Sequence, residues 1–228
     1  MLFGIFMLQA VGVLFMAETS VRRPGALASM KPRLHAPARV RRPLLLVVPA
    51  AVAAWALAGL YGSLGPTLLR HMIGSRSAAL GGLTLFALAA GGVVNVLLLH
   101  RQPARIMLSS GALLLFAGVG VTLIAIDASS VAAFFLGTTI AGMGFGASFQ
   151  SSMRTVMPLA AAHERAGVLS VMYVVAYLAF GLPAVLAGFG VVYGGGMLAT
   201  ARVYGFAVMA LAALALLGVL VHQPKSVH

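Results

Sequence analysis

Seven apolar segments dominate this chain of 228 residues, and six of them are long enough to cross a lipid bilayer. A transmembrane helix needs about 20 apolar residues, because each residue adds about 1.5 Å and the hydrocarbon core is about 30 Å thick. The sequence therefore predicts an all-α fold, a polytopic membrane helix bundle embedded in lipid. The first segment falls slightly short of the required length. The seven segments cover residues 1–17, 43–63, 78–99, 106–126, 131–152, 167–191 and 203–221.

The basic residues between these segments lie mostly on one side of the predicted bundle. If every segment spans, the connections alternate between two faces, and twelve of the fifteen Lys and Arg residues fall on the same face. Cytoplasmic loops carry the Lys/Arg excess in multi-spanning proteins. We therefore expect a multi-pass protein of the cytoplasmic (inner) cell membrane, with the N-terminus outside and the C-terminus in the cytoplasm.

The composition excludes several classes of protein. Charged residues make up 8% of the chain, against about 25% in a soluble domain. The net charge of +12 does not indicate nucleic-acid binding, because no basic face is interleaved with aromatic residues. The absence of cysteine excludes disulfides and thiolate metal sites. The three acidic residues, Glu18, Asp127 and Glu164, all fall in loops or at interfaces, so no buried carboxylate is available for proton coupling.

A polar interval separates the first apolar segment from the other six. Residues 18–42 hold seven basic residues and, with Pro43 directly after them, a set of four prolines. Such a composition cannot build a packed core and predicts a cytoplasmic linker. We therefore expect three parts: a transmembrane helix over 1–17, the linker over 18–42, and a six-helix bundle over 43–228.

Five short stretches form a set of motifs whose order and spacing along the chain can be compared with those of known families. They are Ala17–Thr19, Trp55–Pro66, His100–Arg105, Gly142–Gln150 and Glu164–Ser170. Their order and spacing resemble the sixth helix, the central loop and helices seven to twelve of a major facilitator superfamily transporter. Each stretch is weakly specific by itself, and the order of all five carries the resemblance. The loop at His100–Arg105 lacks the Asp of the family's Gly/Asp/Arg loop motif, so the charge-relay role of that motif is not carried over.

The resemblance implies a function and a partner. The family works as two six-helix halves that rock about a central site. The chain would then be the C-terminal half of a secondary active transporter of small organic solutes, with drug or metabolite efflux as the favoured case. Transport would require a missing N-terminal half, and the sequence given would be incomplete as a transporter. Two alternatives stay open: a truncated, non-transporting protein that pairs with a separate N-terminal half, and a sugar or small-metabolite carrier.

No cofactor, metal site or enzyme activity is expected, because every histidine lies in a loop or at a segment end. Neutral polar residues within the segments are instead the candidates for a substrate cavity. Asn95 either hydrogen-bonds another helix or contacts the solute, and Gln150 either packs at a helix end or binds the solute. Tyr61 is either an interfacial aromatic residue or a cavity residue. Tyr173 and Tyr177 share one helix face, where they either pack or stack on an aromatic or cationic solute.

Two further groups of residues carry predictions about movement. Pro183, beside Gly181, removes a backbone hydrogen bond in mid-segment, which gives either a static kink or a hinge. Arg154 and Arg165 bracket a cytoplasmic loop that contains Glu164. These three residues either anchor the topology or latch a cytoplasmic gate through salt bridges.

Overall fold

The computed structural model describes residues 2–16, 37–74 and 78–221, and every element in those ranges is a helix. The chain divides into two units, Met1–Pro32 and Arg33–His228. The first unit contains α1, Leu2–Leu14, which is apolar but shorter than a bilayer-spanning helix. The expected first segment is thus helical over most of its length, and Glu18 lies outside the described residues.

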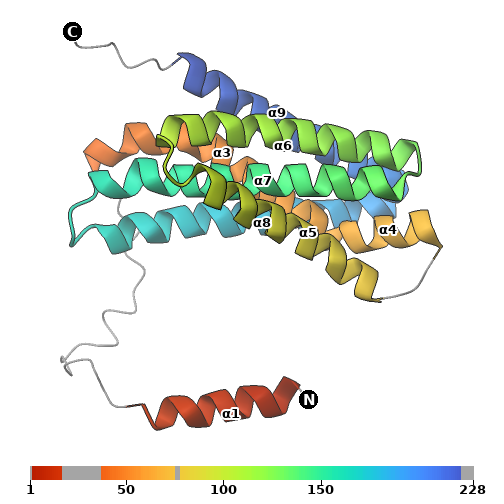
Figure 1. The fold of residues 1–228 in the computed structure, drawn as a ribbon, viewed down its shortest axis with the longest axis horizontal. Helices are drawn as coiled ribbons and strands as arrows, with labels where there is room; N and C mark the ends of the chain where they lie inside the picture. The colour runs from red at the N-terminus through yellow and green to blue at the C-terminus, as the bar shows by residue number, and fades with distance from the viewer. Residues whose placement is uncertain (1, 17–36, 75–77, 222–228) are drawn as a thin grey trace. The chain divides into compact units, whose positions relative to one another are not determined.

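The second unit contains the six predicted spans, and each is long and apolar enough to cross a membrane. The prediction of a polytopic all-α bundle is confirmed, and the chain is a multi-pass membrane protein. Figure 1 shows the helices of this unit running alongside one another. Their bounds are α3, Ala38–Ser63; α4, Gly65–Ile73; α5, Ala78–Leu99; α6, Ala104–Asp127; α7, Val131–Val156; η1, Met157–Leu159; α8, Arg165–Tyr193; and α9, Gly196–Val221.

The first spanning helix begins five residues earlier than expected. The linker was predicted to extend to residue 42, but α3 starts at Ala38, directly after Pro37. Proline disfavours helix at the residue before it and pre-sets the backbone angle for a helix after it, so Pro37 fixes the start. Pro43 and Pro49 lie inside α3, where each removes one backbone hydrogen bond without ending the helix. The preceding part of the predicted linker, residues 18–36, lies outside the described residues.

The connection after α3 contains a short helix that the sequence analysis did not predict. The helix α4 starts at Gly65, one residue after the cap Leu64, and Pro66 occupies its first turn. Proline is favoured at that position because the amide that it lacks has no helical partner there. The helix ends at Ile73 and is capped by Gly74, whose positive φ of 69° suits glycine.

Basic residues gather at one end of the bundle, where α3, α6 and α8 begin and α5, α7 and α9 end; we call it the arginine-rich end. Three arginines there tie different helices together through backbone carbonyls. The bonds are Arg39 Nε to Leu159 O at 3.0 Å, Arg105 Nη2 to Val219 O at 3.2 Å, and Arg154 Nη1 to His100 O at 3.2 Å. At the opposite end Arg202 pairs with Asp127 at 2.6 Å. These contacts establish the alternating arrangement of the six spans.

The helix α7 is the centre of the packing, since it contacts α3, α5 and α6. Glycines make these close approaches possible. A Cβ atom at Gly142 would overlap the carbonyl oxygen of Leu88 in α5, and one at Gly118 in α6 would overlap the backbone of Ala141. In lipid, helix association depends on such close packing because no hydrophobic force draws helices together. The helix α8 packs instead on α3 and α9.

Candidate functional site

Aromatic side chains from two helices, α7 and α8, surround Trp55 in the middle of α3. Its ring centroid lies 5.3 Å from that of Phe149, 5.8 Å from Phe145, 6.0 Å from Tyr177 and 6.5 Å from Phe180. We call these five residues the aromatic cluster. Most of the pairs meet edge to face, a geometry that aromatic rings favour. The cluster therefore links α3, α7 and α8 on one face of the bundle.

Helical spacing brings these rings together. Phe145 and Phe149 are four residues apart in α7, and Tyr173 and Tyr177 are four residues apart in α8, so each pair shares one helix face. Tyr173 stacks on Tyr177 with 6.3 Å between ring centroids. Tyr173 is 44% exposed and Tyr177 is 65% exposed. The two tyrosines thus extend the aromatic cluster outward and offer free ring surface.

A groove of about 660 Å³ lies beside the cluster, between α5 and α7. Its size falls in the range of about 300–1,000 Å³ that is usual for small-molecule sites. The rings of Phe145 and Phe149 belong to both the groove and the aromatic cluster. Other lining residues include Gly92, Val96, Gln150 and Arg154. The candidate site is therefore an apolar, partly aromatic surface with a few polar groups.

Gln150 and Asn95 have different positions relative to this groove. Gln150 lines it, and packing at a helix end and binding of a solute both stay predictions for this residue. Asn95 is only 4% exposed, and its side-chain amide donates to the Met143 carbonyl oxygen at 2.9 Å. That bond joins α5 to α7, so the structure gives Asn95 the interhelical hydrogen bond that was one of its two interpretations.

Tyr61 does not have the cavity or interface position that the sequence suggested. The side chain is 1% exposed and lies among α3, α6 and α7. Its hydroxyl is 2.7 Å from Thr122 Oγ1, which in turn donates to Gly118 O at 2.9 Å. Polar groups buried in a bundle must find partners within it, and this chain of bonds holds Tyr61 in the packed interior.

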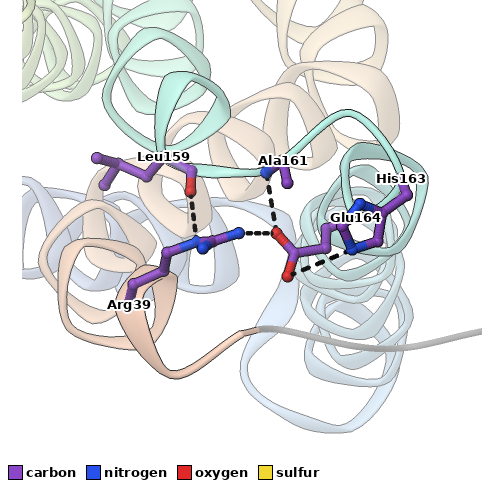
Figure 2. A network of polar contacts seen from close by, with 5 residues as sticks. All are labelled: Arg39, Leu159, Ala161, His163 and Glu164. Atoms are coloured by element: carbon purple, nitrogen blue, oxygen red, sulfur yellow. Dashed lines mark hydrogen bonds and ion pairs between the residues drawn. The ribbon is translucent and has the colours of Figure 1, made fainter.

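The loop acid Glu164 forms an ion pair, but its partner is a residue that the sequence analysis missed. Figure 2 shows Glu164 Oε2 between the Arg39 guanidinium and the Ala161 backbone N–H, which donates at 2.9 Å. Arg154 contacts His100 O and Met107 Sδ instead, and Arg165 is the exposed first residue of α8. Arg39 is 125 residues away in sequence, and no local pattern could have revealed the pair.

The surroundings of Glu164 favour its charged form. The Ala161 N–H, followed by the hydrogen bond and charge of Arg39, holds the pKa of Glu164 below the ordinary value of 4.5. His163 Nε2 lies 4.0 Å from the other carboxylate oxygen. The α7–α8 connection is therefore tied to the start of α3 by one carboxylate.

The helix α8 continues through Gly181 and Pro183 without a break. Four of its five buried residues, Val168, Met172, Ala176 and Ala179, precede the proline, and Ala187 alone follows it. A side chain at Gly181 would meet open space. The segment after Pro183 is thus the less buried part of α8, and a hinge at Gly181 and Pro183 stays a prediction.

Trp55 lies in one of the five stretches that carry the family resemblance, but no role was predicted for it. The signal was available, since it is the chain's single tryptophan and lies in the middle of an apolar segment. Its indole Nε1 is buried and has no hydrogen-bond partner among the described residues. A buried donor without a partner is unusual and marks positions of interest in a structure.

Comparison of the chain with known protein families, with curated proteins and with solved structures found no match.

Proposed function

We propose that this chain is the C-terminal half of a major facilitator-type carrier that moves small organic solutes across the membrane, with efflux of drug-like or metabolite solutes as the favoured case. The observation that carries the proposal is the groove between α5 and α7, which joins the aromatic cluster on one face of a bilayer-spanning bundle. Concave apolar sites with a few convergent polar groups are the usual form of small-molecule sites.

The chemistry of the face favours apolar and aromatic solutes. Stacked and edge-to-face aromatic contacts each contribute about 0.5–1.5 kcal/mol beyond the burial of their area. Of the described acids, Asp127 is the last residue of α6 and Glu164 precedes α8, and both pair with arginines at the ends of the bundle. A solute would therefore be held by burial and ring contacts rather than by a membrane-embedded carboxylate.

Transport would require a second half. Large apolar residues of α5 and α8 are exposed in the isolated bundle, among them Phe86, Val93 and Leu97 of α5. We propose that an N-terminal six-helix half packs on this side, so that the groove and the aromatic cluster line a cavity between two halves. Rocking of the halves would expose the cavity to each side of the membrane in turn. The arginine-rich end would face the cytoplasm.

The test uses the cells that make this chain naturally, since these also contain any N-terminal half. A strain that lacks the chain is compared with one in which the full chain is restored, and both are loaded with a fluorescent amphipathic dye. We expect expression to lower the retained dye, and the double substitution Trp55→Ala with Phe149→Ala to restore it to the level of cells without the chain. A matched control is Phe206→Ala, since Phe206 is exposed on α9 and lies outside the aromatic cluster. Equal dye retention in all strains, with the protein in the membrane, would overturn the transport proposal.

A non-transporting protein that acts by helix pairing is the second candidate, and the exposed apolar residues of α5 favour it. Under this alternative the dye test fails, but cross-linking from α5 captures another membrane-spanning chain. A sugar carrier is supported less, because sugars need several hydrogen-bonding groups and Gln150 is the amide that lines the groove. Competition of dye efflux by sugars would favour that alternative.

A further inference from the structure

The groove between α5 and α7 has two chemically different ends. It extends along α5 from Ala89 to Leu97 and along α7 from Phe145 to Arg154, so it runs from mid-membrane toward the arginine-rich end. The mid-membrane part is lined by glycine, aliphatic and phenyl groups. Gln150 and Arg154 lie at the other end, and among the described residues that line the groove Arg154 is the one that is charged. A ligand that fits along it would need one apolar end and one polar end.

Arg154 is held in place but keeps donors free. Its Nη1 donates to His100 O at 3.2 Å and lies 3.5 Å from Met107 Sδ. Its Nε and Nη2 make no hydrogen bond within the described residues. A guanidinium presents its donors in a rigid planar fork that matches carboxylate, sulfonate and phosphate groups. Fixing one nitrogen orients this fork, so Arg154 has donors available for an anion.

No acid compensates the charge of Arg154 within the part of the chain that the structure describes. Glu164 binds Arg39, and Asp127 binds Arg202 at the opposite end of the bundle. An unpaired arginine beside an apolar groove, at the depth of the lipid headgroups, attracts anions.

We infer that the groove binds an amphipathic anion, with its anionic group on Arg154 and its apolar body against Val96, Phe145 and Phe149. The eight-residue advance from Ala89 to Leu97 corresponds to about 12 Å of helix, which suits an aromatic ring with a short alkyl tail. This inference rests on the proposed function and specifies the substrate class. The same chemistry is offered by a free organic anion and by an anionic phospholipid, and the test distinguishes the two.

The single tryptophan provides the measurement, because Trp55 contacts Phe149 and Phe149 lines the groove. The purified full chain in neutral detergent is titrated with 4-butylbenzoate and, separately, with its uncharged methyl ester, while Trp55 fluorescence is recorded. We expect the carboxylate to bind more tightly than the ester. Arg154→Gln should weaken carboxylate binding about tenfold to a hundredfold, as expected for loss of a hydrogen bond between charged groups, and change ester binding less than about twofold.

Three further variants test whether carboxylate binding depends on the position and charge of Arg154 and on the space in the groove. Arg165→Gln removes the same charge at the same end but outside the groove, and should leave both affinities unchanged. Arg154→Lys keeps the charge and should retain part of the carboxylate preference. Val96→Phe fills the groove and should weaken binding of both probes. Thermal unfolding of each variant shows whether the fold is kept, and Arg154→Lys carries the test if Arg154→Gln does not fold.

The outcomes separate this inference from the proposed function. Equal binding of acid and ester, or no response to either probe in the folded protein, overturns the anion inference, while dye efflux tests transport independently. A carboxylate preference lost in Arg154→Gln supports it. If phosphatidylglycerol in the micelle competes with the carboxylate and phosphatidylcholine does not, the anion bound in the membrane is a lipid; if neither competes, it is a free solute.

Discussion

At the residue scale, the single carboxylate of Glu164 connects two segments that are far apart in the sequence. It accepts hydrogen bonds from the Ala161 backbone and from Arg39, whose Nε also donates to Leu159 O. One acid thus holds the start of α3 against the connection between α7 and α8 (Figure 2). The contact lies within the described bundle, so it stabilises this unit by itself.

The lowered pKa of Glu164 predicts a pH dependence of stability. A carboxylate whose folded pKa lies below its unfolded value stabilises the fold fully above the unfolded pKa, here about 4.5, and loses that contribution as the pH falls through the folded value. We expect the midpoint temperature of thermal unfolding of the purified chain to decrease as the pH is lowered below about 4.5. Glu164→Gln should lower the unfolding temperature at pH 7, and the unfolding temperature of this variant should decrease less in acid. The measurement is thermal unfolding in detergent from pH 3 to 8.

The control for this experiment is Asp127→Asn, which breaks the other described ion pair between a carboxylate and an arginine, at the opposite end. Asp127 is half exposed and its pair with Arg202 is open to water, so its loss should matter less. An identical acid profile in wild type and Glu164→Gln would contradict the prediction.

The buried hydroxyl of Tyr61 makes a second prediction at this scale. Tyr61→Phe removes the bond to Thr122 but keeps the ring against Phe134. Interhelical hydrogen bonds in membranes contribute about 0.6 kcal/mol on average and about 1.7 at most. We expect a loss of that size in the free energy of unfolding, measured by titration with a denaturing detergent. Tyr193→Phe is the matched control, because Tyr193 is 82% exposed and should tolerate the change.

At the scale of helices, the close contacts of α7 depend on residues that lack a side chain. A methyl group at Gly142 would overlap the Leu88 carbonyl, which forces α5 away from α7. Overpacking of this kind costs about 1–3 kcal/mol, and we expect Gly142→Ala to destabilise the bundle by that amount. Gly188→Ala is the control, since a side chain there meets open space and alanine is the better helix former. Equal unfolding curves for the two variants would contradict this account of the packing.

The elements were predictable to different degrees, for physical reasons. The six spans follow from apolar length, a signal that bilayer thickness makes strong. The early start of α3 was missed because its basic first turn, Arg39 to Arg42, reads as linker. The short α4 was missed because nine residues with two basic side chains resemble a loop.

The candidate site was predictable only in part. Helical periodicity predicted that Tyr173 and Tyr177 share a face, and it could not predict that Trp55 lies beside Tyr177, because that contact depends on how α3 and α8 pack. The ion pair of Arg39 with Glu164 and the burial of Tyr61 also depend on packing between distant segments, so they could not be predicted from local spacing. Local spacing reveals which residues share a helix face, and packing between distant helices decides which faces meet.

At the scale of the whole molecule, the proposed orientation depends on charge. Among the described residues, seven arginines lie at the arginine-rich end and two lie toward the other end. The seven are Arg39, Arg41, Arg42, Arg101, Arg105, Arg154 and Arg165, and the two are Arg70 and Arg202. Because Lys and Arg are retained on the cytoplasmic side, we propose that the connection between α7 and α8 lies inside and that between α6 and α7 lies outside.

The absence of native cysteine makes this orientation directly measurable, since any introduced cysteine is the single reactive thiol. Ala162→Cys lies in the connection between α7 and α8, and Ala128→Cys lies between α6 and α7; both positions are exposed. In intact cells, a membrane-impermeant maleimide should label Ala128→Cys and leave Ala162→Cys unlabelled until the membrane is opened. The reverse pattern would invert the proposed topology and place Arg154 at the outer leaflet. An amphipathic anion would then reach the groove from outside the cell, so uptake would replace efflux as the favoured direction.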